Sequence, residues 1–246
     1  MSDIVCIAHR GASGNGHCPE NTLAAFDKAI KIGADCVECD VHSTKDGRIV
    51  IMHDNTLNRT TDKKGAIIDM SLDEIKKADA GSWFAKEFAN ERVPTLREFL
   101  DLIKGKAIAV IEIKPDNITD KVIKDIDEAD AAGDILLQSF YPAAVKASLE
   151  ISPRIPRALL IGGGIPVIRN SGILELLYKA TEVGASTLNL SHNLITPALV
   201  KESHKRGVNV WAWTVDDETR MKELIEMNVD GITSNYPDKL LNVSSI

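Results

Sequence analysis

Three acidic residues stand where short apolar runs end, and their side chains could bind one cation together. Glu38 and Asp40 lie two positions apart in the run CVECD, so on a β-strand their side chains point to the same face. Glu112 stands near the end of a second apolar run, AIAVIEI. Carboxylates gathered in one site repel one another unless a counter-charge is present. Oxygen ligands of this kind suit Mg²⁺ or Ca²⁺, so we expect one divalent cation there.

Two histidines and two basic residues complete the set of candidate functional groups. His9 and Arg10 follow the apolar run IVCIA, His53 ends the run IVIMH, and Lys114 ends the run IEIK. Two histidines beside an oxygen-ligated cation suggest a general acid and a general base. Arg10 and Lys114 are suited to hold an anionic group such as phosphate.

Each of these groups also has an ordinary structural explanation. One carboxyl group could be protonated, or Arg10 and Lys114 could neutralise the carboxylates without a metal. His9 could bond only to the backbone at a strand end, while Arg10 could simply be solvated. A functional site is favoured because all of these groups stand at, or beside, the ends of predicted strands.

Helix-like and strand-like segments alternate along most of the chain. Amphipathic segments end near a glycine, which tolerates the left-handed conformation of a helix C-cap, and runs rich in Val, Ile and Leu follow. We predict eight core strands, at about residues 4–9, 36–40, 107–113, 135–139, 157–161, 187–190, 209–214 and 231–235. Eight such units in 246 residues predict an α/β fold, a TIM (β/α)8 barrel, whose mouth gathers the strand ends. A doubly wound sheet is second, because no Gly-rich dinucleotide loop follows the first strand.

A predicted β-hairpin interrupts this alternation after the second strand. In the stretch VHSTKDGRIVIMHD, Asp46 and Gly47 are typical of a two-residue turn between antiparallel strands. The returning run therefore cannot be the next parallel strand, which would need a long crossover. With this turn, Asp40 would face His53, and the hairpin would bring His53 back to the mouth of the barrel.

The segment after the hairpin, residues 55–92, lacks a clean alternation of helix and strand. It contains a helix-like stretch near SLDEIKKADA and an aromatic stretch, GSWFAKEF. We interpret it as a compact insertion on the carboxyl face of the barrel, with a long loop plus one helix as the alternative. Residues 1–246 would then form a single TIM-barrel catalytic domain.

Composition and charge exclude several classes of protein. The net charge of −7 and the lack of a basic stripe argue against a nucleic-acid binder. No apolar stretch is long enough to span a membrane, and no signal peptide is evident, so we expect a cytoplasmic protein without stable membrane association. Four cysteines do not suggest a disulfide framework. The oligomeric state is not predicted.

The order of short motifs resembles that of the glycerophosphodiester phosphodiesterase family. The stretches that carry the resemblance are HRGASG (9–14), PENTLAAF (19–26), VECDV (37–41), KDGRIVIMHD (45–54), NRTT (58–61), VPTLREFL (93–100), IEIK (111–114) and WTVD (213–216). They cover nearly the whole chain. The resemblance implies a TIM-barrel variant with a small insertion after the hairpin. It also implies a small-molecule partner, a glycerophosphodiester substrate, and its divalent-metal-dependent cleavage into glycerol 3-phosphate and an alcohol.

Roles for individual residues follow from the same resemblance. It implies an acid–base pair, His9 and His53; metal ligands Glu38, Asp40 and Glu112; phosphate contacts Arg10 and Lys114; and a tryptophan near the glycerol, Trp213. The spacing of the tryptophans agrees, because Trp211 and Trp213 share one strand face and only the second is near the strand end. Core packing is the alternative for Trp213. Neither the nucleophile, water or the substrate 2-hydroxyl, nor the division of roles between the histidines is predicted.

The sequence departs from the family pattern at a few positions. The loop Asn15–Cys18 lengthens the connection between HRGASG and PENT, and we expect His17 within it to be solvated, with a position at the mouth as the alternative. Asp216 and Asn235 also differ from the residues expected near their strand ends. These departures bear on substrate preference more than on chemistry. Two other functions stay open: a related TIM-barrel phospholipase acting on membrane lipid, and a non-catalytic module that binds phosphate or metal.

Overall fold

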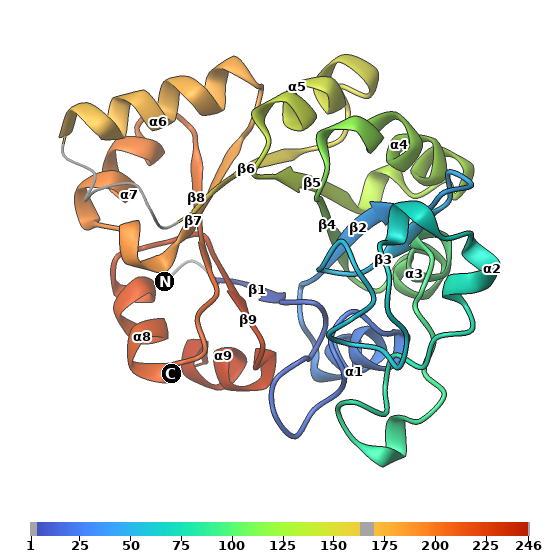
Figure 1. Cartoon of the computed structure of the whole chain (residues 1–246). Coiled ribbons are helices and arrows are strands. Elements are labelled where there is room, and N and C mark those ends of the chain that lie inside the picture. Colours follow the sequence, from blue (N-terminus) through green and yellow to red (C-terminus); the bar gives the residue numbers. More distant parts are fainter. Residues whose placement is uncertain (1–3, 163–169, 246) are drawn as a thin grey trace.

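The computed structural model of the chain describes residues 4–162 and 170–245. Within them, eight parallel strands pair in the order β1-β9-β8-β7-β6-β5-β4-β2, and β2 pairs again with β1 (Figure 1). The strands are β1 (Val5–Ala8), β2 (Cys36–Ser43), β4 (Ile108–Ile113), β5 (Ile135–Ser139), β6 (Arg157–Ile161), β7 (Thr187–Ser191), β8 (Asn209–Trp213) and β9 (Gly231–Ser234). Because the ring closes, the predicted TIM barrel is confirmed and the open sheet is excluded.

Helices cover the outside of the barrel (Figure 1). They are α1 (Leu23–Ile32), α3 (Leu96–Ile103), α4 (Thr119–Glu128), α5 (Pro142–Ile151), α6 (Asn170–Glu182), α7 (Pro197–His204), α8 (Glu218–Glu226) and α9 (Pro237–Ser244). Local sequence sets the ends of α1: Thr22 Oγ1 accepts a hydrogen bond from the Ala25 N–H, and Gly33 ends the helix with a φ of 96°. Among the described helices, none combines the length and apolar character needed to cross a membrane.

The interior of the barrel is apolar at its amino end and largely polar at its carboxyl end. The amino end is filled by a buried cluster of Ile7, Cys36, Val110, Leu136, Ala158 and Trp211. Two positions further along the same strands lie His9, Glu38, Glu112, Gln138, Leu160 and Trp213, which line a cavity. Side chains alternate between the two faces of a strand, so residues two positions apart point to the same face. The apolar residues at the amino end and the residues that line the cavity therefore all point into the barrel. A glycine at position 231 leaves space for the side chain of Trp211 in this apolar cluster, since a Cβ there would lie only 2.8 Å from the indole.

The hairpin forms as predicted, but its register differs. β3 (Ile49–Ile51) pairs antiparallel with β2 across a loop of three residues, and Gly47 at the end of this loop has a φ of 78°. A three-residue loop with a left-handed glycine replaces the expected two-residue turn. Asp40 consequently lies opposite Met52, whose N–H donates to the Asp40 carbonyl at 2.9 Å. The prediction that Asp40 faces His53 is therefore wrong by one residue.

The segment between β3 and α3 contains three short helices and an apolar core of its own. The helices are η1 (Ile67–Asp69), α2 (Leu72–Ile75) and η2 (Lys86–Phe88). The core comprises Val50, Met52, Leu57, Ile67, Ile75, Ala78, Ala80 and Val93. A capping box between Ser71 and Glu74 begins α2. Because Met52 belongs to this core, the residue next to His53 is anchored in the segment rather than in the barrel.

Candidate active site

Three carboxylates come together at the carboxyl ends of β2 and β4. The parallel register sets Asp40 beside Glu112, and Glu38 lies two residues earlier on β2. One oxygen from each residue can be chosen so that all three oxygens lie within 4.8 Å of one another. All three side chains are buried. A donor set of three carboxylates fits a hard divalent cation such as Mg²⁺ or Ca²⁺.

Burial and mutual repulsion make this cluster costly to keep fully ionised. The pKa of Glu38 is raised well above its usual range, first by burial and then by Asp40 and Glu112. Burial, followed by the charge of Asp40, raises the pKa of Glu112 to about 7. Burial also acts on Asp40, but Arg10 and Lys114 hold the pKa of that carboxyl well below its usual range. A cation bound among the three groups would relieve their repulsion.

Arg10 and Lys114 both contact these carboxylates. Arg10 Nε lies 3.3 Å from Asp40 Oδ2. Lys114 Nζ lies 2.8 Å from Glu112 Oε1 and 3.1 Å from Asp40 Oδ1. The backbone of Arg10 is left-handed, with a φ of 56°, and its N–H donates to Glu38 Oε2 at 2.9 Å. Neutralisation by two basic residues thus has a geometric basis, because each oxygen of Asp40 lies within ion-pair distance of one of them.

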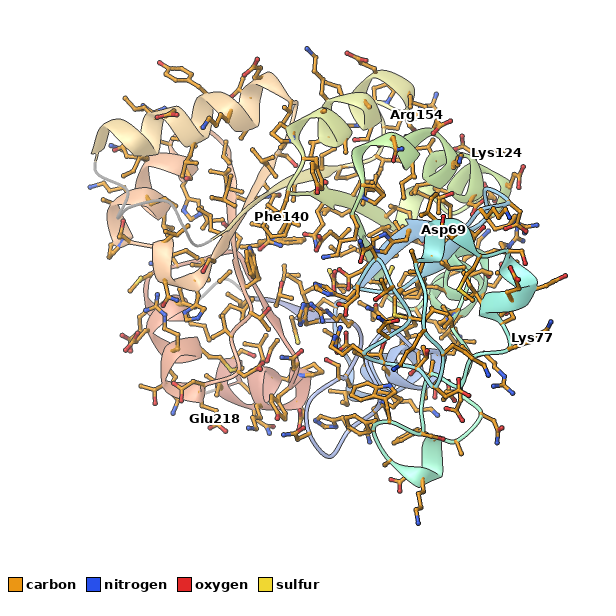
Figure 2. All side chains as sticks on the ribbon, in the orientation of Figure 1. Asp69, Lys77, Lys124, Phe140, Arg154 and Glu218 are labelled. Atoms are coloured by element: carbon orange, nitrogen blue, oxygen red, sulfur yellow. The ribbon has the colours of Figure 1, made fainter. Side chains whose placement is uncertain are left out.

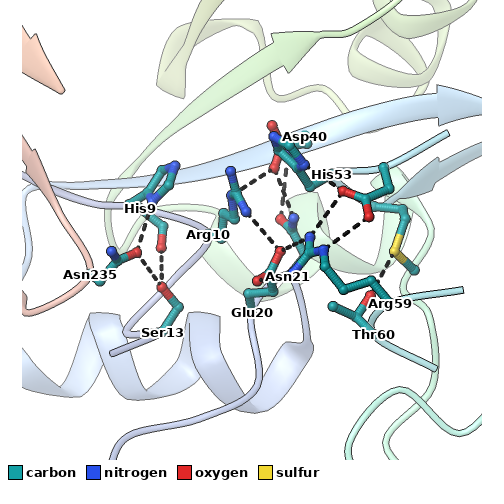
Figure 3. A network of polar contacts seen from close by, with 12 residues as sticks. His9, Arg10, Ser13, Glu20, Asn21, Asp40, His53, Arg59, Thr60 and Asn235 are labelled. Atoms are coloured by element: carbon teal, nitrogen blue, oxygen red, sulfur yellow. Dashed lines mark hydrogen bonds and ion pairs between the residues drawn. The ribbon is translucent and has the colours of Figure 1, made fainter. Parts of the chain in front are cut away.

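His9 is held by Asn235, which follows β9, the last strand of the barrel (Figure 3). Asn235 is held in turn by Asp216, which follows β8. His9 Nδ1 lies 2.8 Å from Asn235 Oδ1. Asn235 donates from its Nδ2 to Asp216 Oδ2 at 2.7 Å, and this bond fixes which side of the amide faces the imidazole. Nδ1 must therefore carry the proton, which leaves Nε2 as the unprotonated nitrogen. Burial, followed by the charge of Arg10, lowers the pKa of His9 to about 4.

His53 is held by a carboxylate, at one end of a chain of ion pairs (Figure 3). Its Nδ1 lies 2.7 Å from Asp54 Oδ1. Arg59 donates to both oxygens of Asp54, at 2.9 and 3.0 Å, and to both oxygens of Glu20, each at 2.8 Å. Arg10 Nη1 donates to Glu20 Oε1 at 2.8 Å. The chain of contacts therefore connects the imidazole of His53 with the guanidinium of Arg10.

Five residues of these two networks are not predicted as site residues from the sequence: Glu20, Asp54, Arg59, Asp216 and Asn235. Asn235 ends the last predicted strand and Asp54 directly follows His53, so the rule that strand ends carry function could have found both. Glu20 and Arg59 stand in the stretches PENT and NRTT, but no local pattern indicates that they pair with each other. Their contact depends on two loops far apart in the sequence.

A small cavity, the inner cavity, lies at the centre of the mouth and has a volume of about 90 Å³. Trp213 lines it, whereas Trp211 belongs to the apolar cluster at the amino end of the barrel. Trp213 donates from Nε1 to the Asn189 carbonyl at 3.1 Å and meets Phe140 edge to face. Figure 2 shows Phe140 near the middle of the barrel. Two buried atoms of the cavity residues, Asn189 Oδ1 and Thr233 Oγ1, have no hydrogen-bond partner among the described residues.

Two features lie apart from this site. His17 pairs with Asp238 Oδ1 at 3.0 Å and its side chain is only 15% exposed, so the expectation that it is solvated is wrong. A hollow of about 940 Å³ opens between α7 and α8 and is larger than the inner cavity, but it contains no predicted site residue. In it, His204 pairs with Asp230, which precedes β9 at the amino end of the barrel.

Comparisons with known proteins agree with this arrangement. Residues 9–239 match the model of the glycerophosphoryl diester phosphodiesterase family. The chain is 39% identical to a glycerophosphodiester phosphodiesterase of Caldanaerobacter subterraneus subsp. tengcongensis and 31% identical to one of Bacillus altitudinis, each over 96% of both chains. It superposes with a TM-score of 0.88 on a phosphodiesterase of Oleispira antarctica in complex with the product sn-glycerol-3-phosphate, at 29% identity over 98% of this chain and 96% of the other. From its sequence, its barrel and its polar mouth, this chain belongs to the glycerophosphoryl diester phosphodiesterase family.

Proposed function

We propose that this protein hydrolyses glycerophosphodiesters to glycerol 3-phosphate and an alcohol, with a divalent cation, Mg²⁺ or Ca²⁺, as cofactor. The observation that carries the proposal is the group of three buried carboxylates in one mouth with two histidines, each held at Nδ1. Relatives named for this reaction, and a similar structure that contains sn-glycerol-3-phosphate, support the substrate class.

Glu38, Asp40 and Glu112 would hold the cation. When bound, it would supply positive charge to the phosphoryl oxygens and so favour the more highly charged transition state. Arg10 and Lys114 already lie against the same carboxylates, so a phosphate entering the mouth would meet their donors without a large rearrangement. Their charges would add to the stabilisation of the phosphoryl group.

The inner cavity is suited to the glycerol moiety. Its volume of about 90 Å³ admits only a small group. Asn189 Oδ1 and Thr233 Oγ1 are buried there without partners, and a ligand with several hydroxyl groups would satisfy both. Trp213 offers a flat apolar surface for the carbon skeleton. Glycerol has this combination of hydroxyl groups and a short carbon chain.

We assign the role of general base to His9 and that of general acid to His53. His9 lines the inner cavity, and its low pKa keeps Nε2 free to accept a proton from a nucleophile on the glycerol side. His53 bonds to the carboxylate of Asp54, which would stabilise the protonated imidazole before it gives its proton to the leaving alcohol. Substitution of either histidine by alanine should lower turnover by at least about a hundredfold without unfolding the protein.

Water and the glycerol 2-hydroxyl are the two candidate nucleophiles. Attack by the hydroxyl would have the advantage of proximity and would produce a transient cyclic phosphate. A diester built on propane-1,3-diol, which lacks the 2-hydroxyl, distinguishes them. Turnover of this substrate at the rate of the glycerol diester would indicate water. Loss of its turnover, together with a cyclic phosphate in the phosphorus NMR spectrum of the reaction with the glycerol diester, would indicate the hydroxyl.

The experiment that tests the proposed function is release of glycerol 3-phosphate from glycerophosphocholine and glycerophosphoethanolamine. The protein would be treated with EDTA, and Mg²⁺ or Ca²⁺ would be added back separately. We expect activity to disappear with EDTA and to return with at least one ion. Activity that survives EDTA would overturn the role of the cation, and no release from either diester under any condition would overturn the proposed reaction.

A further inference from the structure

A second and wider depression, the outer groove, opens beside the inner cavity. Its volume is about 670 Å³, and its walls include Asn55, Ile67, Ile68, Ile118, Phe140 and Tyr141. Three segments contribute them: η1 with its preceding loop, the connection from β4 to α4, and the connection from β5 to α5. The groove therefore lies between the inserted segment and the barrel itself.

The two depressions meet at residues of the proposed catalytic site, including the expected phosphate contact Lys114. His53, Glu112 and Lys114 line both of them, and Phe140 forms a shared wall. His9, by contrast, lines only the inner cavity. A phosphodiester at the junction would extend one substituent to each side. His53, the proposed general acid, reaches the outer groove and His9 does not, so a leaving alcohol protonated by His53 would extend into the outer groove.

The chemistry of the outer groove differs from that of the inner cavity. Large apolar side chains are exposed along its rim: Ile68 is 61% exposed, Tyr141 49% and Phe140 40%. Exposed apolar groups that gather in one place mark interaction surfaces, and where they line a groove, as here, a bound ligand is one such partner. The inner cavity instead carries unpartnered polar atoms and has about a seventh of the volume, 90 against 670 Å³. Each depression thus suits a different substituent of the diester.

We propose that the outer groove binds the leaving alcohol and favours alcohols with a bulky apolar or aromatic body over small ones. This inference rests on the proposed phosphodiesterase function. An apolar body laid on Ile68 and Tyr141 would remove these side chains from water, and the phosphate would stay fixed at the junction. Because the contact would persist in the transition state, it would raise kcat/KM for the bulkier substrate.

Two synthetic substrates of matched chemistry test the inference: the ethyl and the 2-phenylethyl diesters of sn-glycerol 3-phosphate. Both leaving groups are primary alcohols, and they differ in the phenyl ring. We expect kcat/KM for the phenylethyl diester to exceed that for the ethyl diester by about tenfold. A ratio near one while both diesters are cleaved would overturn the inference and leave the proposed function intact. Failure to cleave any glycerophosphodiester would instead overturn the proposed function.

Variants at the rim make the test specific to the groove. Tyr141→Ser and Ile68→Ser should each lower the ratio of kcat/KM for the phenylethyl diester to that for the ethyl diester by at least about threefold. Tyr141 is the N-cap of α5, a position that serine suits, and Ile68 is mostly exposed, so both variants should fold. Tyr178→Ser, at an exposed tyrosine of α6 outside the groove, is the matched control. A preference unchanged in both rim variants would overturn the inference.

Discussion

The two histidines of the site differ in the residue that holds Nδ1. A neutral amide, Asn235, holds His9, whereas a carboxylate, Asp54, holds His53. An amide fixes the tautomer of an imidazole but does not stabilise its cation as a carboxylate does. The two histidines therefore differ in their proposed acid–base roles before any substrate binds. His9 is suited to accept a proton and His53 to give one.

Asn235→Ala should separate this orienting effect from stability. Without the amide, the His9 imidazole can adopt the wrong tautomer, so we expect kcat to fall about ten- to a hundredfold with little change in KM. Steady-state kinetics on glycerophosphoethanolamine measures both values. Asn209→Ala, at an exposed asparagine that begins β8, is the control and should keep the wild-type kcat. Wild-type turnover in Asn235→Ala would contradict the assigned role.

Arg59 is the residue whose loss should disturb the greatest number of these contacts. It binds Asp54 and Glu20 at once, and its hydrogen bond is the main reason why the pKa of Asp54 is lowered to about 2. Arg59→Ala should lower kcat about tenfold or more, because Asp54 would no longer be held against His53. Added guanidinium should restore part of the loss. Arg59→Lys, which cannot bind two carboxylates side-on, should be intermediate.

Arg97→Lys is the control for these variants and should keep the wild-type rate. Arg97 forms an exposed ion pair with Asp101 on α3, outside the barrel. Such a pair contributes little to stability and nothing to the site. Rates equal to wild type in Arg59→Ala, or a loss that guanidinium leaves untouched, would show that the ion-pair chain does not position His53.

At the scale of elements, the barrel strands were predictable and the hairpin register was not. β4 (Ile108–Ile113) lies within one residue of the prediction, because buried parallel strands appear as continuous apolar runs. β2 (Cys36–Ser43) extends beyond its predicted end at residue 40, since it continues into the hairpin. The register depends on which residue of the turn is left-handed. Both two- and three-residue loops end on a glycine such as Gly47, so the sequence does not distinguish them.

Gly47 should therefore be costly to replace although space is available around it. Its φ is 78°, and a Cβ there would meet only Lys121 Nζ, at 3.8 Å. Gly47→Ala should lower the free energy of unfolding in urea by about 1 kcal/mol, from the backbone conformation alone. Gly133→Ala is the matched control, because a Cβ there meets nothing within 4 Å and its φ is not positive. Equal stability of the two variants would contradict the assigned turn geometry.

Candidate site residues were predictable to the extent that a strand end determines their place. The proximity of Glu38, Asp40 and Glu112 could be predicted, because alternation along a strand fixes the face of each side chain and the order of strands in a barrel fixes which strands are neighbours. The contact between Glu20 and Arg59 could not, because it joins two loops whose paths the sequence does not determine. The roles of all these residues, and the assignment of the whole chain to one domain, stay predictions.

At the scale of the whole molecule, the buried carboxylates connect cofactor binding with stability. A cation that binds the folded mouth and not the unfolded chain stabilises the protein by mass action. At about 100 times its dissociation constant, Mg²⁺ or Ca²⁺ should raise the Tm of EDTA-treated protein by about 5–10 °C in calorimetry. Asp40→Asn should abolish the shift. An equal shift in this variant, or none with either ion in the wild type, would argue against the site.

Closure of the barrel places the first strand of the chain beside the last. Ala8 is registered with Ser234, and His9 bonds to Asn235, 226 residues away in the sequence. During synthesis, the three carboxylates, the two basic residues and His53 would all emerge from the ribosome long before Asn235, the partner of His9. The proton-accepting nitrogen would thus be set only when the final unit docks, so a chain still lacking that unit would not hold His9 in the tautomer that the proposed base requires.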